Sequence, residues 1–131
     1  MIKPEYKYSE LTGKIIGFAM AVHRILGNGF QEVIYQRALA LELRTAGLDF
    51  AREFEMPITY RQQQIGTRRV DFLVNSIISV ELKALIKLEA VHLAQAINYL
   101  KAYNLEIGLL INFGNTKLEF HRLENKKYKN V

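Results

Sequence analysis

Three charged residues in two neighbouring segments have the types and the spacing of a hydrolytic site. Asp71 lies in the segment 69–74, and Glu81 and Lys83 lie two positions apart in the segment 78–83. Apolar and polar residues alternate in both segments, as they do in half-buried strands. Glu81 and Lys83 should therefore point to the same face of a sheet.

A short turn between these segments would bring the two carboxylates together. A turn over residues 75–77 would pair Val74 with Ile78 and place Asp71 opposite Glu81. Opposed carboxylates on a sheet repel each other, unless a cation lies between them. Hard oxygen ligands of this kind suit Mg²⁺ or Mn²⁺, so the pattern predicts a divalent-metal site.

The pattern Asp71, Glu81 and Lys83 contains the parts that phosphodiester hydrolysis needs. Carboxylates hold the cation, which polarises a phosphoryl oxygen and acidifies bound water. A neighbouring lysine can orient the attacking water and offset the charge that develops on the phosphate. The alternative is a solvated strand face on which Glu81 and Lys83 form a weak surface pair.

Glu32 adds a third carboxylate in the first turn of a helix expected over residues 31–46. Its negative charge suits the positive end of the helix, so a purely structural role is available. If it faces the sheet, it would complete the coordination of a divalent ion together with Asp71 and Glu81. Tyr35 lies three residues on and is expected on the same helix face.

Two polar residues interrupt the apolar helix expected over residues 89–103. Gln95 and Tyr99 are four apart and share a face, with His92 alongside. They could position the lysine, a water or a phosphate. For Gln95 we favour this role over a solvent-exposed helix edge. For Tyr99 a role in the site and half-buried packing both stay open.

Composition predicts one domain spanning residues 1–131 with an ample core, since half of the residues are hydrophobic. The chain has no cysteine, which excludes disulfides and thiolate zinc sites and suits a cytoplasmic protein. No apolar run approaches the ~20 residues of a membrane helix. The net charge of +5 suits a nucleic-acid partner but equally suits simple solubility. So small an excess predicts weak binding by one copy, which a homodimer or a partner protein would strengthen.

Hydrophobic periodicity predicts helices and strands in the order helix, helix, three strands, helix, two strands. Residues 62–66 are expected to form a turn, and the continuous apolar run 107–111 to form a strand buried on both faces. Hairpins plus a crossover helix predict a mixed sheet with helices packed on it, a fold of the α/β class in the broad, α+β sense. The expected ranges are 10–26, 31–46, 50–60, 69–74, 78–83, 89–103, 107–111 and 118–123.

The chain resembles the GxxExxY proteins, a group within the PD-(D/E)XK nuclease superfamily. Four ordered motifs carry the resemblance, which extends from about residue 11 to residue 123. They are Gly29-x-x-Glu32-x-x-Tyr35, Arg69-Val70-Asp71 with Val80-Glu81-Leu82-Lys83-Ala84, His92-Leu93-Ala94-Gln95 with Asn98-Tyr99-Leu100, and the run 108–114. Val70 stands where the superfamily name has proline, a position at which that proline is frequently lost.

The resemblance implies a restriction-endonuclease-like αβββαβ core with an extra N-terminal helix. It implies metal-binding roles for Asp71 and Glu81, the catalytic lysine role for Lys83, an auxiliary acidic role for Glu32 and a position near the site for Gln95. The expected function is a divalent-metal-dependent nuclease acting on DNA or RNA. The alternatives are a non-catalytic module that binds nucleic acid or a protein on the same fold, and a structural subunit of a larger complex.

Overall fold

A computed structural model describes residues 6–130 of the chain, so both ends of the expected domain 1–131 lie outside the described residues. The order of helices and strands agrees with the order predicted from periodicity. The elements are α1 (Ser9–Leu26), α2 (Glu32–Thr45), β1 (Phe50–Tyr60), β2 (Gln63–Val74), β3 (Ile78–Lys83), α3 (Ala90–Tyr103), β4 (Ile107–Asn112) and β5 (Glu119–Glu124).

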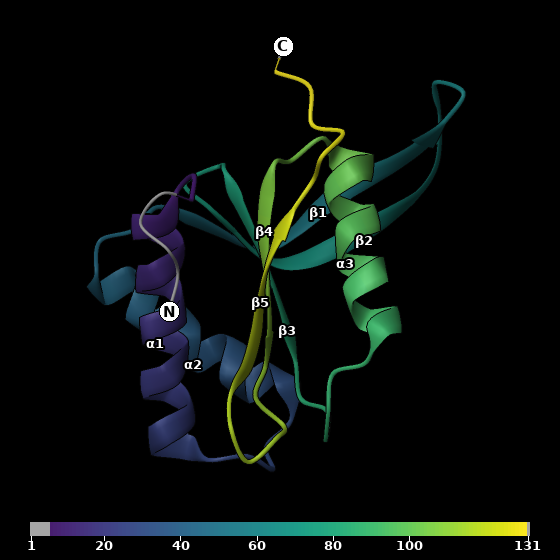
Figure 1. The fold of residues 1–131 in the computed structure, drawn as a ribbon. Helices are drawn as coiled ribbons and strands as arrows, with labels where there is room; N and C mark the ends of the chain where they lie inside the picture. Colours follow the sequence, from purple (N-terminus) through teal and green to yellow (C-terminus); the bar gives the residue numbers. More distant parts are fainter. Residues whose placement is uncertain (1–5, 131) are drawn as a thin grey trace.

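The five strands form one strongly twisted mixed sheet in the order β1-β2-β3-β4-β5 (Figure 1). β3 and β4 are parallel and are joined by the crossover helix α3, while the other neighbouring strands are antiparallel. All six residues of β4 are buried, as expected for a strand covered on both faces. The predicted mixed fold is therefore confirmed.

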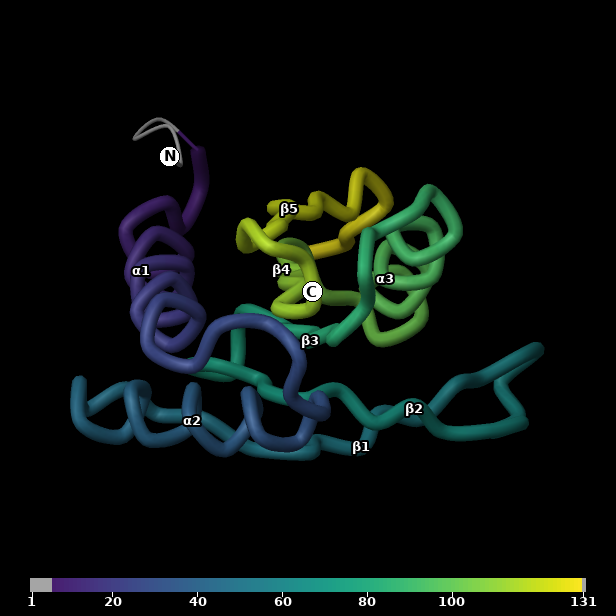
Figure 2. The backbone as a smooth tube through the Cα atoms, turned by 90° about the horizontal axis from the view of Figure 1, so that it is seen from below, coloured from purple at the N-terminus to yellow at the C-terminus, as the bar shows by residue number. Residues whose placement is uncertain are grey.

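Helices cover the two faces of the sheet and define two apolar cores. One core joins α1 and α2 to β2, β3 and β4, and includes Ile16, Leu39 and Phe72. The other lies under α3 and includes Leu100 and Leu110. Figure 2 shows α2 along one side of the sheet and α3 on the other. Along the described residues, no helix is long and apolar enough to cross a bilayer.

The prediction of a turn over residues 62–66 is wrong, because most of this segment belongs to β2. β1 and β2 form a long hairpin that closes at Arg61 and Gln62, which have φ of 47° and 64°. Two consecutive residues with positive φ are typical of the tight turn that matches the twist of paired strands. Such turns usually carry Asn or Gly, and a run of three glutamines without apolar alternation gave no sign of a strand.

Candidate active site

An irregularity shared by β1 and β2 positions Asp71. Glu53 lies across from Asp71 and has a left-handed φ of 53°, while regular pairs flank it on both sides. Phe72 packs in the core under α1 and α2, whereas Val70 packs in the core under α3. Residues two apart in a regular strand would share one face. At Asp71, therefore, the side chains of β2 that had pointed toward one face of the sheet begin to point toward the other.

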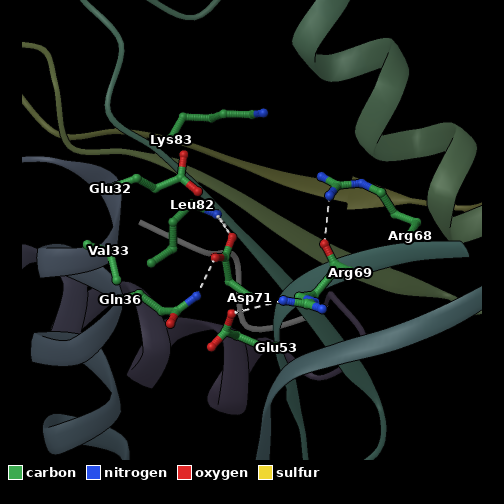
Figure 3. A pocket seen from close by; sticks show the side chains of 9 residues that line it. All are labelled: Glu32, Val33, Gln36, Glu53, Arg68, Arg69, Asp71, Leu82 and Lys83. Carbon is green, nitrogen blue, oxygen red and sulfur yellow. Dashed lines mark hydrogen bonds and ion pairs between the residues drawn. The ribbon is translucent and has the colours of Figure 1, made fainter.

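Asp71 is held by two hydrogen bonds from different elements. Its Oδ1 accepts from the Gln36 side-chain amide of α2 at 2.7 Å, and its Oδ2 accepts from the Leu82 backbone N–H of β3 at 2.8 Å (Figure 3). The predicted pairing of Val74 with Ile78 is confirmed, and the ladder continues to Phe72 and Val80. Beyond that pair, the carboxylate of Asp71 takes the place of a backbone acceptor, so β2 separates from β3 where the site opens.

Glu81 lies on β3 and is only 6% exposed. Its Oε2 accepts a hydrogen bond from the Arg68 guanidinium at 2.8 Å, which is an ion pair. The same guanidinium lies over the ring of Tyr99, 4.4 Å from its centroid. Glu81 is thus buried and bonded to an arginine of β2, and the alternative of a solvated strand face with Lys83 as its partner does not hold.

Lys83 ends β3 and is positioned through its backbone. Its carbonyl accepts from the Phe113 N–H at 2.9 Å. The next turn is clamped by the fully buried Asn112, whose side chain accepts from the Leu85 N–H and donates to the Leu85 carbonyl at 2.8 and 2.9 Å. Gly114 approaches this turn so closely that an added Cβ would lie 2.2 Å from the Leu85 carbonyl oxygen.

The segment from Gly29 to Tyr35 divides its roles between structure and site. Gly29 has a φ of 109°, a conformation that favours glycine. Tyr35 is fully buried, donates to the Gly27 carbonyl at 2.6 Å and stacks on Phe113. Its hydroxyl thus ties the connection between α1 and α2, and Tyr35 does not share the outward face of Glu32. Glu32 is the residue of this segment that lines the site.

Glu32, Asp71 and Lys83 line one cavity of about 350 Å³, together with Gln36, Arg68, Arg69, Glu53, Val33 and Leu82 (Figure 3). Three acidic groups are called the site carboxyls below: Glu32 and Asp71, which line the cavity, and Glu81, which does not line it but bonds Arg68 of its wall. Burial is the largest cause that raises the pKa of each of them. The negative charges of Asp71 and Glu81 raise the pKa of Glu32 further, whereas Arg68 and Lys83 oppose the rise at all three.

The donor chemistry of the cavity fits a hard divalent cation. Among residues 6–130, no three acidic, histidine or cysteine side chains lie close enough together to form a complete metal cluster as they stand. However, burial raises the pKa of each site carboxyl, and the opposing charges of Arg68 and Lys83 do not cancel that rise. Gln36 Oε1 is also buried and has no hydrogen-bond partner within the described residues, although its amide nitrogen binds Asp71. Carboxylate and amide oxygens are the ligands that Mg²⁺ and Mn²⁺ prefer.

The two residues expected on α3 have different positions. Tyr99 is partly buried and supports Arg68, which binds Glu81. Gln95 is exposed and is not among the residues that line the cavity. His92 accepts from the Glu89 N–H at 2.9 Å and caps the helix.

Sequence reasoning missed Arg68 and Gln36, which contact the two most buried site carboxyls. Gln36 lies one helical turn after Glu32, so a polar pair on one helix face was available as a signal. Arg68 lies three residues before Asp71 and gave no signal of its own, because its position depends on the exchange of faces in the hairpin.

A mixed five-stranded sheet with acidic residues and a lysine where β2 and β3 separate defines a restriction-endonuclease-like domain. The family model of the PD-(D/E)XK nuclease superfamily matches residues 9–123, and the chain belongs to this superfamily. The crystal structure of SSO0001 is similar in fold, with a TM-score of 0.56 and 19% sequence identity. That match covers 89% of this chain and 59% of the other, so the chain spans little more than half of that protein. A search of curated proteins finds no match.

Proposed function

We propose that this chain is a divalent-metal-dependent nuclease that hydrolyses phosphodiester bonds of nucleic acid. The observation that carries the proposal is a pair of acids with raised pKa values, the half-buried Asp71 and the buried Glu81, of which Asp71 lines an open cavity together with Lys83. Burying acids costs free energy of folding, and perturbed pKa values cluster at functional sites. Membership of a nuclease superfamily supports the same reaction class.

In this proposal Asp71 and Glu81 would hold Mg²⁺ or Mn²⁺, helped by Glu32 directly or through water. The bound ion would acidify water and polarise a phosphoryl oxygen. Gln36 and the Leu82 N–H fix the orientation of Asp71. Lys83 would donate to the attacking water and to the phosphate, at a position that its backbone bond to Phe113 maintains.

The roles on α3 and the finer assignments belong to the same proposal. Tyr99 would act as a positioning residue through Arg68, which it stacks against. Gln95, which is exposed and does not line the cavity, would contact a bound substrate. The assignment to the GxxExxY group, a single domain over residues 1–131 and a cytoplasmic location complete the proposal, and a homodimer is one way in which weak binding would be strengthened.

The test is cleavage of single-stranded and duplex DNA and RNA with Mg²⁺, with Mn²⁺ and with chelator. Glu81→Gln keeps the shape of the side chain and removes its charge, and we expect it to slow metal-dependent cleavage by at least about 100-fold. Glu55→Gln on β1 is the matched control, because Glu55 is exposed and lies outside the cavity. If the wild type and Glu81→Gln behave alike on every substrate, the proposal is wrong.

One observation favours a second candidate, a non-catalytic nucleic-acid- or protein-binding module. The Arg68 guanidinium already bonds Glu81 and partly neutralises it. In a binding module this ion pair would be permanent, whereas in a nuclease Glu81 must become available to a cation. Calorimetric titration distinguishes the two, since absence of Mg²⁺ and Mn²⁺ binding at millimolar concentrations would favour the module.

A further inference from the structure

The β1–β2 hairpin extends well beyond the rest of the molecule, past α3 (Figures 1 and 2). Residues 57–69, called the arm below, form its outer part. None of these residues is buried, and Tyr60 and Ile65 near the tip are 61% and 67% exposed. A two-stranded ribbon without an apolar core is only marginally stable on its own. The arm therefore projects from the domain, and packing against an apolar core does not account for its length.

The charge of the arm is entirely positive. It contains Arg61 at the tip and Arg68 and Arg69 at the base, with no aspartate or glutamate between Glu55 and Asp71. The Arg61 guanidinium lies over the ring of Tyr60 at 5.6 Å. Three consecutive glutamines, residues 62–64, are exposed beside them. Arginine, glutamine and tyrosine are side chains that bind phosphates and base edges.

The same arm is poorly suited to pair with a second copy of the chain. β1 is an edge strand, and strand addition would need its free backbone groups. Pro57 has no N–H to donate, and the register shifts between Ile58 and Thr59. These features disfavour continuous edge pairing, so the side chains of the arm are its available binding groups. Arg68 and Arg69 pair with Glu81 and Glu53 at the base, and Arg61 carries the positive charge at the tip.

We propose that the arm lies in the major groove of duplex DNA and thereby directs the proposed nuclease to duplex DNA; the cleavage part of this inference rests on the proposed function. The major groove of B-DNA, about 12 Å wide, admits a two-stranded ribbon. The major groove of duplex RNA is too deep and narrow for side chains to read. Arg61 at the tip contacts the phosphates or the base edges, and Arg68 joins the arm to the site through Glu81.

The reach of the arm sets the length of duplex that it needs. Gln62 lies nine residues from Asp71 along β2. At about 3.3 Å per strand residue the tip is some 30 Å from the site. This corresponds to at most about nine base pairs along the duplex. A duplex that extends fewer than about nine base pairs from the cut on the arm side cannot contact the tip. The wild type should therefore bind it no more tightly than a variant with a neutral tip does.

The test is binding of labelled duplex DNA, duplex RNA and single-stranded DNA of about 20 nucleotides, twice the estimated reach, measured by fluorescence anisotropy in chelator. We expect Arg61→Glu to weaken duplex DNA binding by about 10-fold or more and to lower the salt dependence by about one ion. Lys14→Glu makes the same charge change at an exposed position of α1 and should cost less than about 2-fold. Arg61→Gly removes the charge while favouring the positive φ of the turn, so a loss of affinity without unfolding identifies the charge itself.

Equal losses in Arg61→Glu and Lys14→Glu would overturn the inference, as would duplex RNA binding as tight as duplex DNA binding or no binding of any duplex by the wild type. Because this experiment contains no divalent metal, it is independent of catalysis. Tip-dependent DNA binding without metal-dependent cleavage would reject the proposed function and keep the arm. Metal-dependent cleavage with no effect of Arg61 would do the reverse.

Discussion

Replacing Gly114 by alanine should be among the most damaging single-methyl changes in this chain. The new Cβ would lie 2.2 Å from the Leu85 carbonyl oxygen and 2.5 Å from both the Ala84 carbonyl carbon and the Leu85 nitrogen. All three neighbours are backbone atoms, so the turn after Lys83 would have to move by roughly 1 Å to restore ordinary contact. No rotation of a side chain can relieve this clash.

The cost follows from what holds that turn in place. Overpacking alone costs about 1–3 kcal/mol. Moving Leu85 also strains its two hydrogen bonds to the buried Asn112, each of which contributes about 1 kcal/mol. We therefore expect a loss of about 3–5 kcal/mol in the free energy of unfolding. For a domain of this size that lowers Tm by roughly 10–20 °C.

Two other glycines are matched controls for this substitution. At Gly108 an added Cβ would meet Ser79 Oγ at 2.7 Å and Leu100 Cδ2 at 2.9 Å, which are ends of side chains that can move. Its cost should be smaller, about 1–2 kcal/mol. At Gly17, exposed on α1 with no atom within 4 Å, alanine should stabilise the helix by up to about 1 kcal/mol.

Urea denaturation of the three variants measures these differences directly, provided that the m-value is unchanged. The order of stability should be Gly17→Ala, wild type, Gly108→Ala and Gly114→Ala. A Gly114→Ala protein as stable as Gly108→Ala would refute the reasoning, because it would mean that the turn after Lys83 is free to move. Gly114→Ala should also weaken metal-dependent cleavage, since the displaced turn directly follows Lys83.

Three further perturbations test the site and its supports. Because the pKa values of the site carboxyls are raised, the metal-free folded protein binds more protons than the unfolded chain, and its stability should rise as pH falls from neutral through those pKa values. The affinity for divalent cations should instead rise with pH. Thermal unfolding and calorimetry across pH measure the two trends, and a metal-free stability that falls on mild acidification would contradict the assigned burial. Arg68→Ala removes the partner of the buried Glu81 and should lower the free energy of unfolding by about 1–3 kcal/mol without metal. Saturating Mn²⁺ should partly restore that stability in a denaturation experiment, and an unchanged loss with Mn²⁺ would argue against cation binding at Glu81. Tyr35→Phe keeps the stacking on Phe113 but loses the hydrogen bond to the Gly27 carbonyl, so the free energy of unfolding should fall by about 1–2 kcal/mol in a denaturation experiment. An unchanged free energy would mean that the connection between α1 and α2 does not need this bond.

The central strands could be predicted from the sequence because their buried positions must be apolar, which gives a strong hydrophobic pattern. The expected segment 78–83 coincides with β3, and the expected 107–111 differs from β4 by one residue. The segment 78–83 alternates apolar and polar residues and 107–111 is a continuous apolar run, and nearly every residue of the two strands is buried. The outer hairpin could not be predicted in this way, since residues 62–65 are exposed and no burial constrains which residue types they carry.

The candidate site was predictable where one element carries the signal and not where two strands must combine. Of the four charged residues expected at the site, Glu32, Asp71 and Lys83 line the cavity, whereas Glu81 does not and instead bonds Arg68, which lines it. The role of Arg68 was hidden, because it reaches Glu81 across β2 and β3 and only after the faces exchange at Asp71. Such a contact is a property of strand geometry, which no local spacing records.

The left-handed Glu53 opposite Asp71 has a consequence for how this scaffold could be redesigned. Pairing resumes beyond it in the same register, from Arg52 with Phe72 to Phe54 with Val70. The outer ribbon could therefore be lengthened by two residues in each strand, which would extend it by about 7 Å and return every side chain to its original side. Neither interior would need repacking, so that specificity elements could be exchanged at the tip while the acid at the junction keeps its place.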